Sequence, residues 1–220
     1  MMKTSVFSRT GLGEQEISPR LYNLTIGLVL CWGFLVNYWM VENIPVESIQ
    51  HINPWVFLLG FLASSIFGCV IYSASSHPLV SFIGYNFVVV PFGLIVNLQV
   101  SQYDPSLVVE AIKVTGLVTG LMMLLGTLFP EFFKRIAGAL TIALLLVVAV
   151  ELYQIFVLGI HQGWLDWAVV LIFCGYIGVD WGRANSIPKT YDNAVDSAAA
   201  LYMDIVILFG RVLQLSSSND

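Results

Sequence analysis

Two aspartates, Asp180 and Asp204, stand inside long apolar stretches. Asp204 lies within Leu201–Phe209, with apolar residues on both sides, and Asp180 directly follows Phe173–Val179. An ionisable side chain at membrane depth is costly unless it faces protein or water, so such residues are rare and most often functional. We therefore take both aspartates as candidates for proton or cation chemistry.

The spacing of the two aspartates suggests that they meet. They are 24 residues apart and equidistant in sequence from Asp192. In a helical hairpin that turns near Pro188–Asp192, equidistant positions lie at similar depth. Adjacent carboxylates at low dielectric resist double ionisation, so the pair would hold one shared proton. Loss of that proton would create repulsion and a site for a hard cation together. This is the chemistry of a pH-sensitive gate.

A plainer interpretation of the same residues stays open from spacing alone. Asp180 could be a helix-end carboxylate at the interface, close to Arg183. Asp204 alone could form a hydrogen bond with a neighbouring helix.

Other polar residues in or near apolar stretches form a second rank of candidates. Asp196 is expected to cap or solvate the start of the last helix. Glu110 is expected near the outer interface, Glu151 deeper in the membrane, and Arg211 extending outward to the headgroups. The three histidines, at positions 51, 77 and 161, lie in or beside loops, so we expect no metal site there. The three cysteines fall in apolar runs and are expected to pack there without forming disulfides.

The elements that must position these side chains are transmembrane helices. The chain is 58% hydrophobic and only 10% charged, too few charges to cover a soluble domain. Apolar runs of roughly 20 residues are long enough to cross a hydrocarbon core of about 30 Å as helices. The expected spans are Leu21–Met40, Pro54–Tyr72, Pro78–Leu98, Leu107–Phe129, Ile136–Leu158, Trp164–Ala184 and Ala194–Leu213. The sequence thus predicts an all-α integral membrane protein with seven transmembrane helices.

The predicted organisation is a single transmembrane domain with short tails. It comprises a cytoplasmic tail at 1–20, a seven-helix domain at 21–215 and a short tail at 216–220. Short connections between spans make sequential helices antiparallel neighbours. The first apolar run is long enough to stay in the bilayer, so no cleavable signal peptide is expected.

Basic residues predict the orientation. With a cytoplasmic N-terminus, seven of the nine Lys and Arg residues fall on the cytoplasmic side: Lys3, Arg9, Arg20, Lys134, Arg135, Arg183 and Lys189. Lys113 and Arg211 fall outside. The positive-inside rule then places the N-terminus in the cytoplasm and the C-terminus outside, in what we expect to be a bacterial inner membrane.

Three motifs resemble bacterial members of the Bax inhibitor family of seven-helix membrane proteins. The first is Gly178-Val-Asp-Trp-Gly-Arg-Ala184, the second covers Asp192–Ser197 and Leu201–Phe209, and the third is Val108-Val-Glu-Ala-Ile-Lys-Val-Thr115. The resemblance implies a central seventh helix surrounded by the other six, and a proton-sensitive calcium leak. It places the family's paired aspartates on Asp180 and Asp204 and a polar helix-four residue on Glu110.

The chain departs from the family pattern at three places. Relatives have basic residues after helix two that latch onto the aspartate pair, whereas this chain has Ser73-Ala-Ser-Ser-His77. The latch is therefore absent or falls to His77 or Arg183. Ile207 replaces a frequent Asn, and Trp181-Gly-Arg183 replaces a Gln-rich segment. These departures affect how strongly the pair would be held closed.

The leading functional prediction is a pH-sensitive calcium leak channel or carrier gated by Asp180 and Asp204. Its partners would be calcium ions, protons and the lipid bilayer, with no nucleic acid and no cofactor besides calcium as the transported ion. One alternative is a non-conducting membrane interaction or scaffold protein. Another is an intramembrane aspartyl protease, although the chain lacks the Gly-x-Gly-Asp and Pro-Ala-Leu patterns of that class. We therefore do not expect an enzyme.

Overall fold

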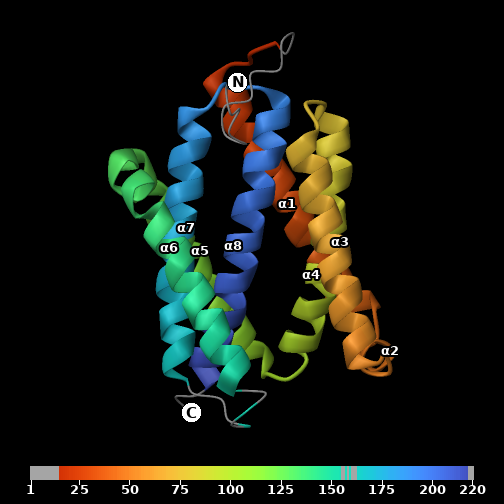
Figure 1. Cartoon of the computed structure of the whole chain (residues 1–220). Coiled ribbons are helices and arrows are strands. Elements are labelled where there is room, and N and C mark those ends of the chain that lie inside the picture. The colour runs from red at the N-terminus through yellow and green to blue at the C-terminus, as the bar shows by residue number, and fades with distance from the viewer. Residues whose placement is uncertain (1–14, 155–156, 158, 160–162, 218–220) are drawn as a thin grey trace. The chain divides into compact units, whose positions relative to one another are not determined.

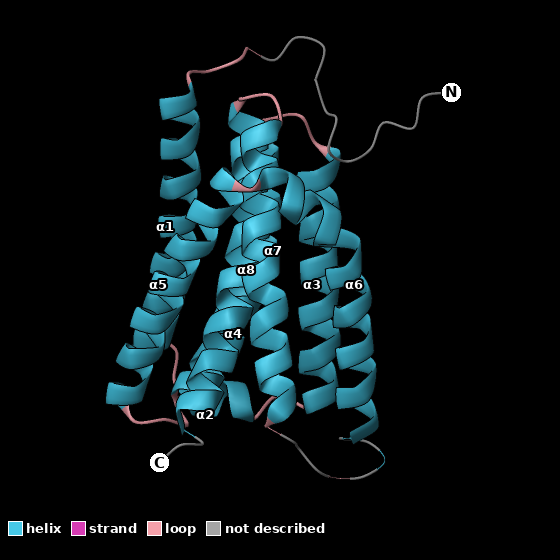
Figure 2. Ribbon diagram, turned by 90° about the vertical axis from the view of Figure 1, so that its left-hand side faces the viewer, coloured by secondary structure: helices cyan, strands magenta, loops and turns pink. Residues whose placement is uncertain are grey.

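The computed structural model describes residues 15–217, apart from 155–156, 158 and 160–162. Within these residues the chain forms eight helices and no strands (Figures 1 and 2). The helices are α1 (Pro19–Asn43), α2 (Val46–Gln50), α3 (Pro54–Ala74), α4 (Pro78–Val100), α5 (Pro105–Leu128), α6 (Pro130–Tyr153), α7 (Trp164–Ser186) and α8 (Tyr191–Ser217).

Seven of these helices are long and apolar enough to cross a membrane. The exception is α2, a five-residue helix inside the segment that we expected to be an irregular connection. The predicted seventh span is therefore α8. The all-α, seven-span prediction is confirmed.

Several helices begin earlier than predicted because a proline opens them. Pro105 starts α5 and Pro130 starts α6. Proline suits the first helical position, where its φ is preset and no N–H is needed. The segment 130–135, predicted to be a loop, is therefore the first turns of α6. That helix ends at Tyr153, and part of the predicted remainder, up to Leu158, lies outside the described residues.

The last helix also begins earlier, at Tyr191 rather than Ala194. Thr190 caps it, since its hydroxyl accepts the N–H of Asn193 at 3.1 Å. Asp192 consequently lies in the first turn of α8 and not in the connecting loop. Its side chain is 1% exposed and accepts a 2.6 Å hydrogen bond from Ser81.

The chain divides into two compact parts. The first, here the α1–α4 part, contains residues up to Gln102 together with Ser186–Tyr202. The second, the α5–α7 part, contains Tyr103–Asn185 and the residues from Met203 onward. Helix α8 (Figure 1) thus supplies its beginning to one part and its end to the other.

A buried polar and aromatic cluster forms the core of the α1–α4 part. Tyr202 and Asn37 exchange hydrogen bonds of 2.7 and 3.0 Å, and the Tyr85 hydroxyl donates to the Val29 carbonyl at 3.1 Å. Both tyrosines are fully buried. A Cβ at Gly33 would collide with the Tyr85 hydroxyl, so the close approach of α1 and α4 requires glycine there. Hydrogen bonds between helices satisfy these groups where water is absent.

In the α5–α7 part, α5 and α7 pack through glycines. A Cβ on Gly126 would lie 2.6 Å from the Gly178 carbonyl oxygen, and one on Gly182 would lie 3.3 Å from the Gly126 carbonyl oxygen. Along this contact, later α7 residues meet later α5 residues, since Gly182 also faces Pro130. The two helices therefore run parallel, and small residues let their backbones approach closely.

Candidate functional site: a carboxyl pair between α7 and α8

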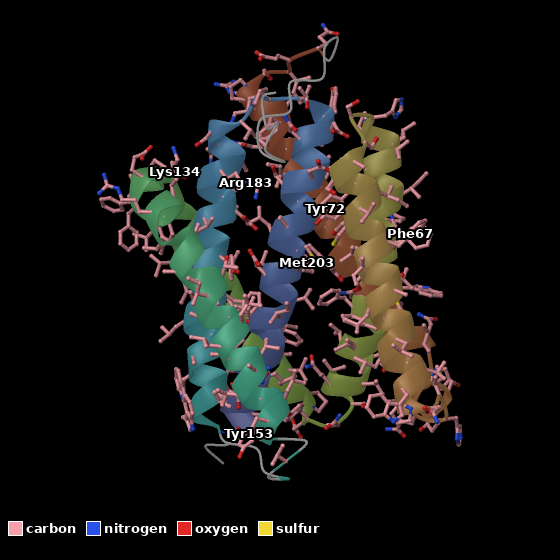
Figure 3. All side chains as sticks on the ribbon, in the orientation of Figure 1. Phe67, Tyr72, Lys134, Tyr153, Arg183 and Met203 are labelled. Atoms are coloured by element: carbon pink, nitrogen blue, oxygen red, sulfur yellow. The ribbon has the colours of Figure 1, made fainter. Side chains whose placement is uncertain are left out.

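Asp180 on α7 and Asp204 on α8 both belong to the α5–α7 part. Their carboxyl groups lie close enough to interact electrostatically with each other. Asp204 is 7% exposed, and the Asp180 side chain is 16% exposed. Figure 3 labels two neighbouring residues: Arg183 on α7 and Met203, which precedes Asp204, on α8.

A hydrogen bond between two carboxyl groups needs a proton on one of them, because a carboxylate can only accept. Asp204 Oδ2 is buried and has no hydrogen-bond partner within the described residues. The Arg183 guanidinium lies 3.7 Å from Asp180 Oδ1, one turn along α7. With one shared proton, the pair carries one negative charge beside one positive charge.

Asp180 and Asp204 do not lie at equal distances from the turn between α7 and α8, so the placement predicted from their spacing is wrong. Asp180 stands six residues before the end of α7 at Ser186, whereas Asp204 stands thirteen residues after the start of α8 at Tyr191. The two positions are therefore not equidistant from the turn. Their carboxyl groups interact electrostatically nonetheless.

A second ionic cluster, centred on Arg211 of α8, lies in the same part. Its guanidinium donates to Asp166 of α7 at 2.7 Å and to Gln214 at 3.3 Å. It also forms a 2.7 Å ion pair with Glu151 of α6, although this contact lacks hydrogen-bond alignment. Arg211 was expected to extend outward to the interface. It is instead held by two carboxylates, the buried Asp166 and the partly buried Glu151, and a buried carboxylate without a cation would be costly.

The remaining predicted candidates lie elsewhere. Glu110 is exposed near the start of α5. Asp196 belongs to the α1–α4 part and lies five residues into α8, so it does not cap that helix. His77 precedes α4 in the α1–α4 part. Of the two latch candidates, Arg183 is the one beside the pair.

Sequence reasoning missed the roles of Asp166 and Asp192. Asp166 was not among the predicted candidates, yet it is 3% exposed and bound by Arg211. One signal was available, since a lone arginine in an apolar helix implies a buried partner. For Asp192 the short spacing from Pro188 suggested a loop.

A family model described as "Inhibitor of apoptosis-promoting Bax1" matches residues 14–220. The chain belongs to the Bax inhibitor family. Two Helicobacter pylori proteins, from strains 26695 and J99 and both described as uncharacterized, are 27% identical over 169 residues. Each match covers 73% of this chain and 70% of the relative. Bax inhibitor family membership agrees with the seven membrane-crossing helices, and this is a channel- or transporter-like family rather than a known enzyme family.

Proposed function

We propose that this protein is a pH-sensitive calcium leak channel or carrier, gated by the Asp180–Asp204 pair. The observation that supports the proposal is the closeness of two carboxyl groups on different helices, one buried (Asp204) and one partly buried (Asp180), which interact with each other. A shared proton lets α7 and α8 pack together. Removing that proton leaves two like charges and a set of hard oxygen ligands suited to calcium.

The repulsion within the ionised pair is comparable to the energy that switches a two-state equilibrium. Two unit charges about 3.5 Å apart repel by roughly 5 kcal/mol at an effective dielectric near 20. Switching a two-state equilibrium from mostly closed to mostly open needs about 5.5 kcal/mol. Arg183 offsets part of this repulsion and so acts as a weak local substitute for the family's latch.

We expect the protein to lie in the bacterial inner membrane.

The test is calcium flux into proteoliposomes between about pH 5 and pH 8. We expect the wild-type leak to rise with pH, because the shared proton leaves as pH increases. Asp204→Asn keeps the shape but cannot ionise, so this variant should lose most of the pH response. Glu131→Gln, which neutralises an exposed carboxylate in the first turn of α6, should leave the response unchanged.

A flat wild-type profile, or an Asp204→Asn protein with the wild-type response, would contradict the proposal. Absence of calcium flux would favour a non-conducting interaction protein. Cleavage of a transmembrane peptide that is lost in Asp204→Asn would favour the protease alternative, since paired carboxyls are compatible with acid–base hydrolysis.

A further inference from the structure

Two buried hydroxyl groups on α5 have no hydrogen-bond partner within the described part of the chain. These are Thr115, which is 3% exposed, and Thr119. Threonine in a membrane helix normally donates to the carbonyl four residues earlier. Thr127 and Thr141 do so, to Met123 at 3.0 Å and to Ala137 at 3.1 Å. The two unpartnered hydroxyls therefore have a different environment.

The face of α5 that carries them points toward α7. Thr115, Thr119 and Gly126 are separated by four and seven residues, which places all three on one side of an α-helix. Gly126 contacts the Gly178 backbone of α7. The opposite side of α5 faces outward, since Leu117, between the two threonines, is 76% exposed.

The rise per residue of a helix shows how far along the α5 axis the two hydroxyls lie from the level of the carboxyl pair. At 1.5 Å per residue, Thr119 lies about 10 Å and Thr115 about 16 Å from the level of Gly126. Gly126 meets α7 at Gly178, two residues before Asp180. Because α5 and α7 run parallel, both threonines lie toward the start of α7, the end at which Asp166 binds Arg211.

We propose that Thr115 and Thr119 line a hydrated cation path that continues from the Asp180–Asp204 pair toward the Arg211 end of the α5–α7 part. This inference rests on the proposed function and extends its site. A buried hydroxyl without a protein partner is stabilised by water or by a cation. Hydroxyl oxygens are hard ligands, as calcium and its hydration shell require. The Oδ2 atom of Asp204, likewise buried without a hydrogen-bond partner in the described residues, begins this series of oxygens.

Thiol labelling tests the path independently of conduction. In a full-length background with the three native cysteines replaced by alanine, Thr115→Cys, Thr119→Cys and the control Leu117→Cys are treated with a charged methanethiosulfonate reagent. The cysteine thiolate attacks the reagent's sulfur and displaces methanesulfinate. Because the thiolate forms only where water reaches the thiol, positions 115 and 119 should react at least about tenfold faster than position 117. Elution as a monodisperse species verifies folding of each variant. Equal rates at all three positions, or no reaction at 115 and 119, would overturn the proposal.

A calcium-flux measurement tests the ligand role. The double substitution Thr115→Val and Thr119→Val removes both hydroxyls at nearly constant volume. At the pH of maximal leak, flux should fall severalfold while the pH midpoint, set by the carboxyl pair, stays in place. Unchanged flux would overturn the ligand role. If the wild type carries no calcium, the proposed function fails, and the labelling pattern still decides whether the path is hydrated.

Discussion

Arg183 is the cation that stands next to Asp180 of the proposed carboxyl pair. Its guanidinium stabilises the ionised form of Asp180 from 3.7 Å. We expect Arg183→Gln to move the pH midpoint of the calcium leak upward, because the proton is held more tightly once the cation is gone. The ion pair is partly exposed and worth about 0.2–1 kcal/mol, which corresponds to less than about one pH unit.

The matched control for Arg183 is Lys134→Gln, a basic residue exposed near the start of α6. Flux profiles of the two variants are measured in the same liposomes. A downward shift of the pH midpoint in Arg183→Gln, or equal shifts of the midpoint in both variants, would contradict a local role for Arg183.

Arg211 has a structural role that can be measured by unfolding. Removing it in Arg211→Ala leaves the buried Asp166 and the partly buried Glu151 without their cation. Breaking a buried ion pair from one side costs about 3–5 kcal/mol, so the variant should unfold at a clearly lower temperature in detergent. Glu151→Gln should cost less, because Arg211 keeps its 2.7 Å contact with Asp166. Equal stability of Arg211→Ala and wild type would show that the cluster contributes nothing.

Among the helices, the contact between α5 and α7 offers a sharp test of packing. In Gly126→Ala the new methyl group would lie 2.6 Å from a backbone carbonyl oxygen, which cannot rotate away. We expect a loss of about 1–3 kcal/mol in unfolding free energy. In the control Gly120→Ala the methyl group meets no atom within 4 Å, so stability should be unchanged or slightly higher. Thermal unfolding of both purified proteins checks this, and a stable Gly126→Ala would refute the close packing.

The spans could be predicted from sequence because the bilayer dictates their length. Apolar runs without charge that are about 20 residues long, such as Pro54–Tyr72, can be interpreted only as transmembrane helices. The helix ends were predicted less accurately. The first turn of α6, which Pro130 opens, contains Glu131, and this polar residue led to the prediction of a loop. The five residues of α2 are too few to carry a periodic pattern.

The candidate site was predictable only in part. Charges in apolar runs identified Asp180, Asp204, Glu151 and Arg211, because such charges are rare at membrane depth. Which of them meet depends on how each helix is rotated and where it starts. Thr190 caps α8 and so fixes its start, but sequence symmetry around Asp192 does not report this. Thr115 ends one of the motifs that resemble the family, but no sequence pattern shows that its hydroxyl or that of Thr119 lacks a partner, since threonine is common in membrane helices.

For the whole molecule, the orientation in the membrane is a prediction that reporters at each terminus can test. Seven of nine basic residues on one side favour a cytoplasmic N-terminus, and seven spans then place the C-terminus outside. A reporter active only in the cytoplasm should work on the N-terminus and fail on the C-terminus. The opposite pattern would invert the orientation, and activity at both ends would mean an even number of spans.

The partners of the first helix also bear on how the protein is made. Tyr22 contacts Ser197 at 3.0 Å, and Asn37 bonds Tyr202; these partners lie 175 and 165 residues later in the chain. Ribosomes add about 5–20 residues per second. The partners of the polar groups of α1 are therefore synthesised roughly 10–30 s after α1 itself. During that interval the nascent chain carries unsatisfied donors in the bilayer. Until α8 is inserted, the membrane holds an assembly intermediate that quality-control proteases can recognise.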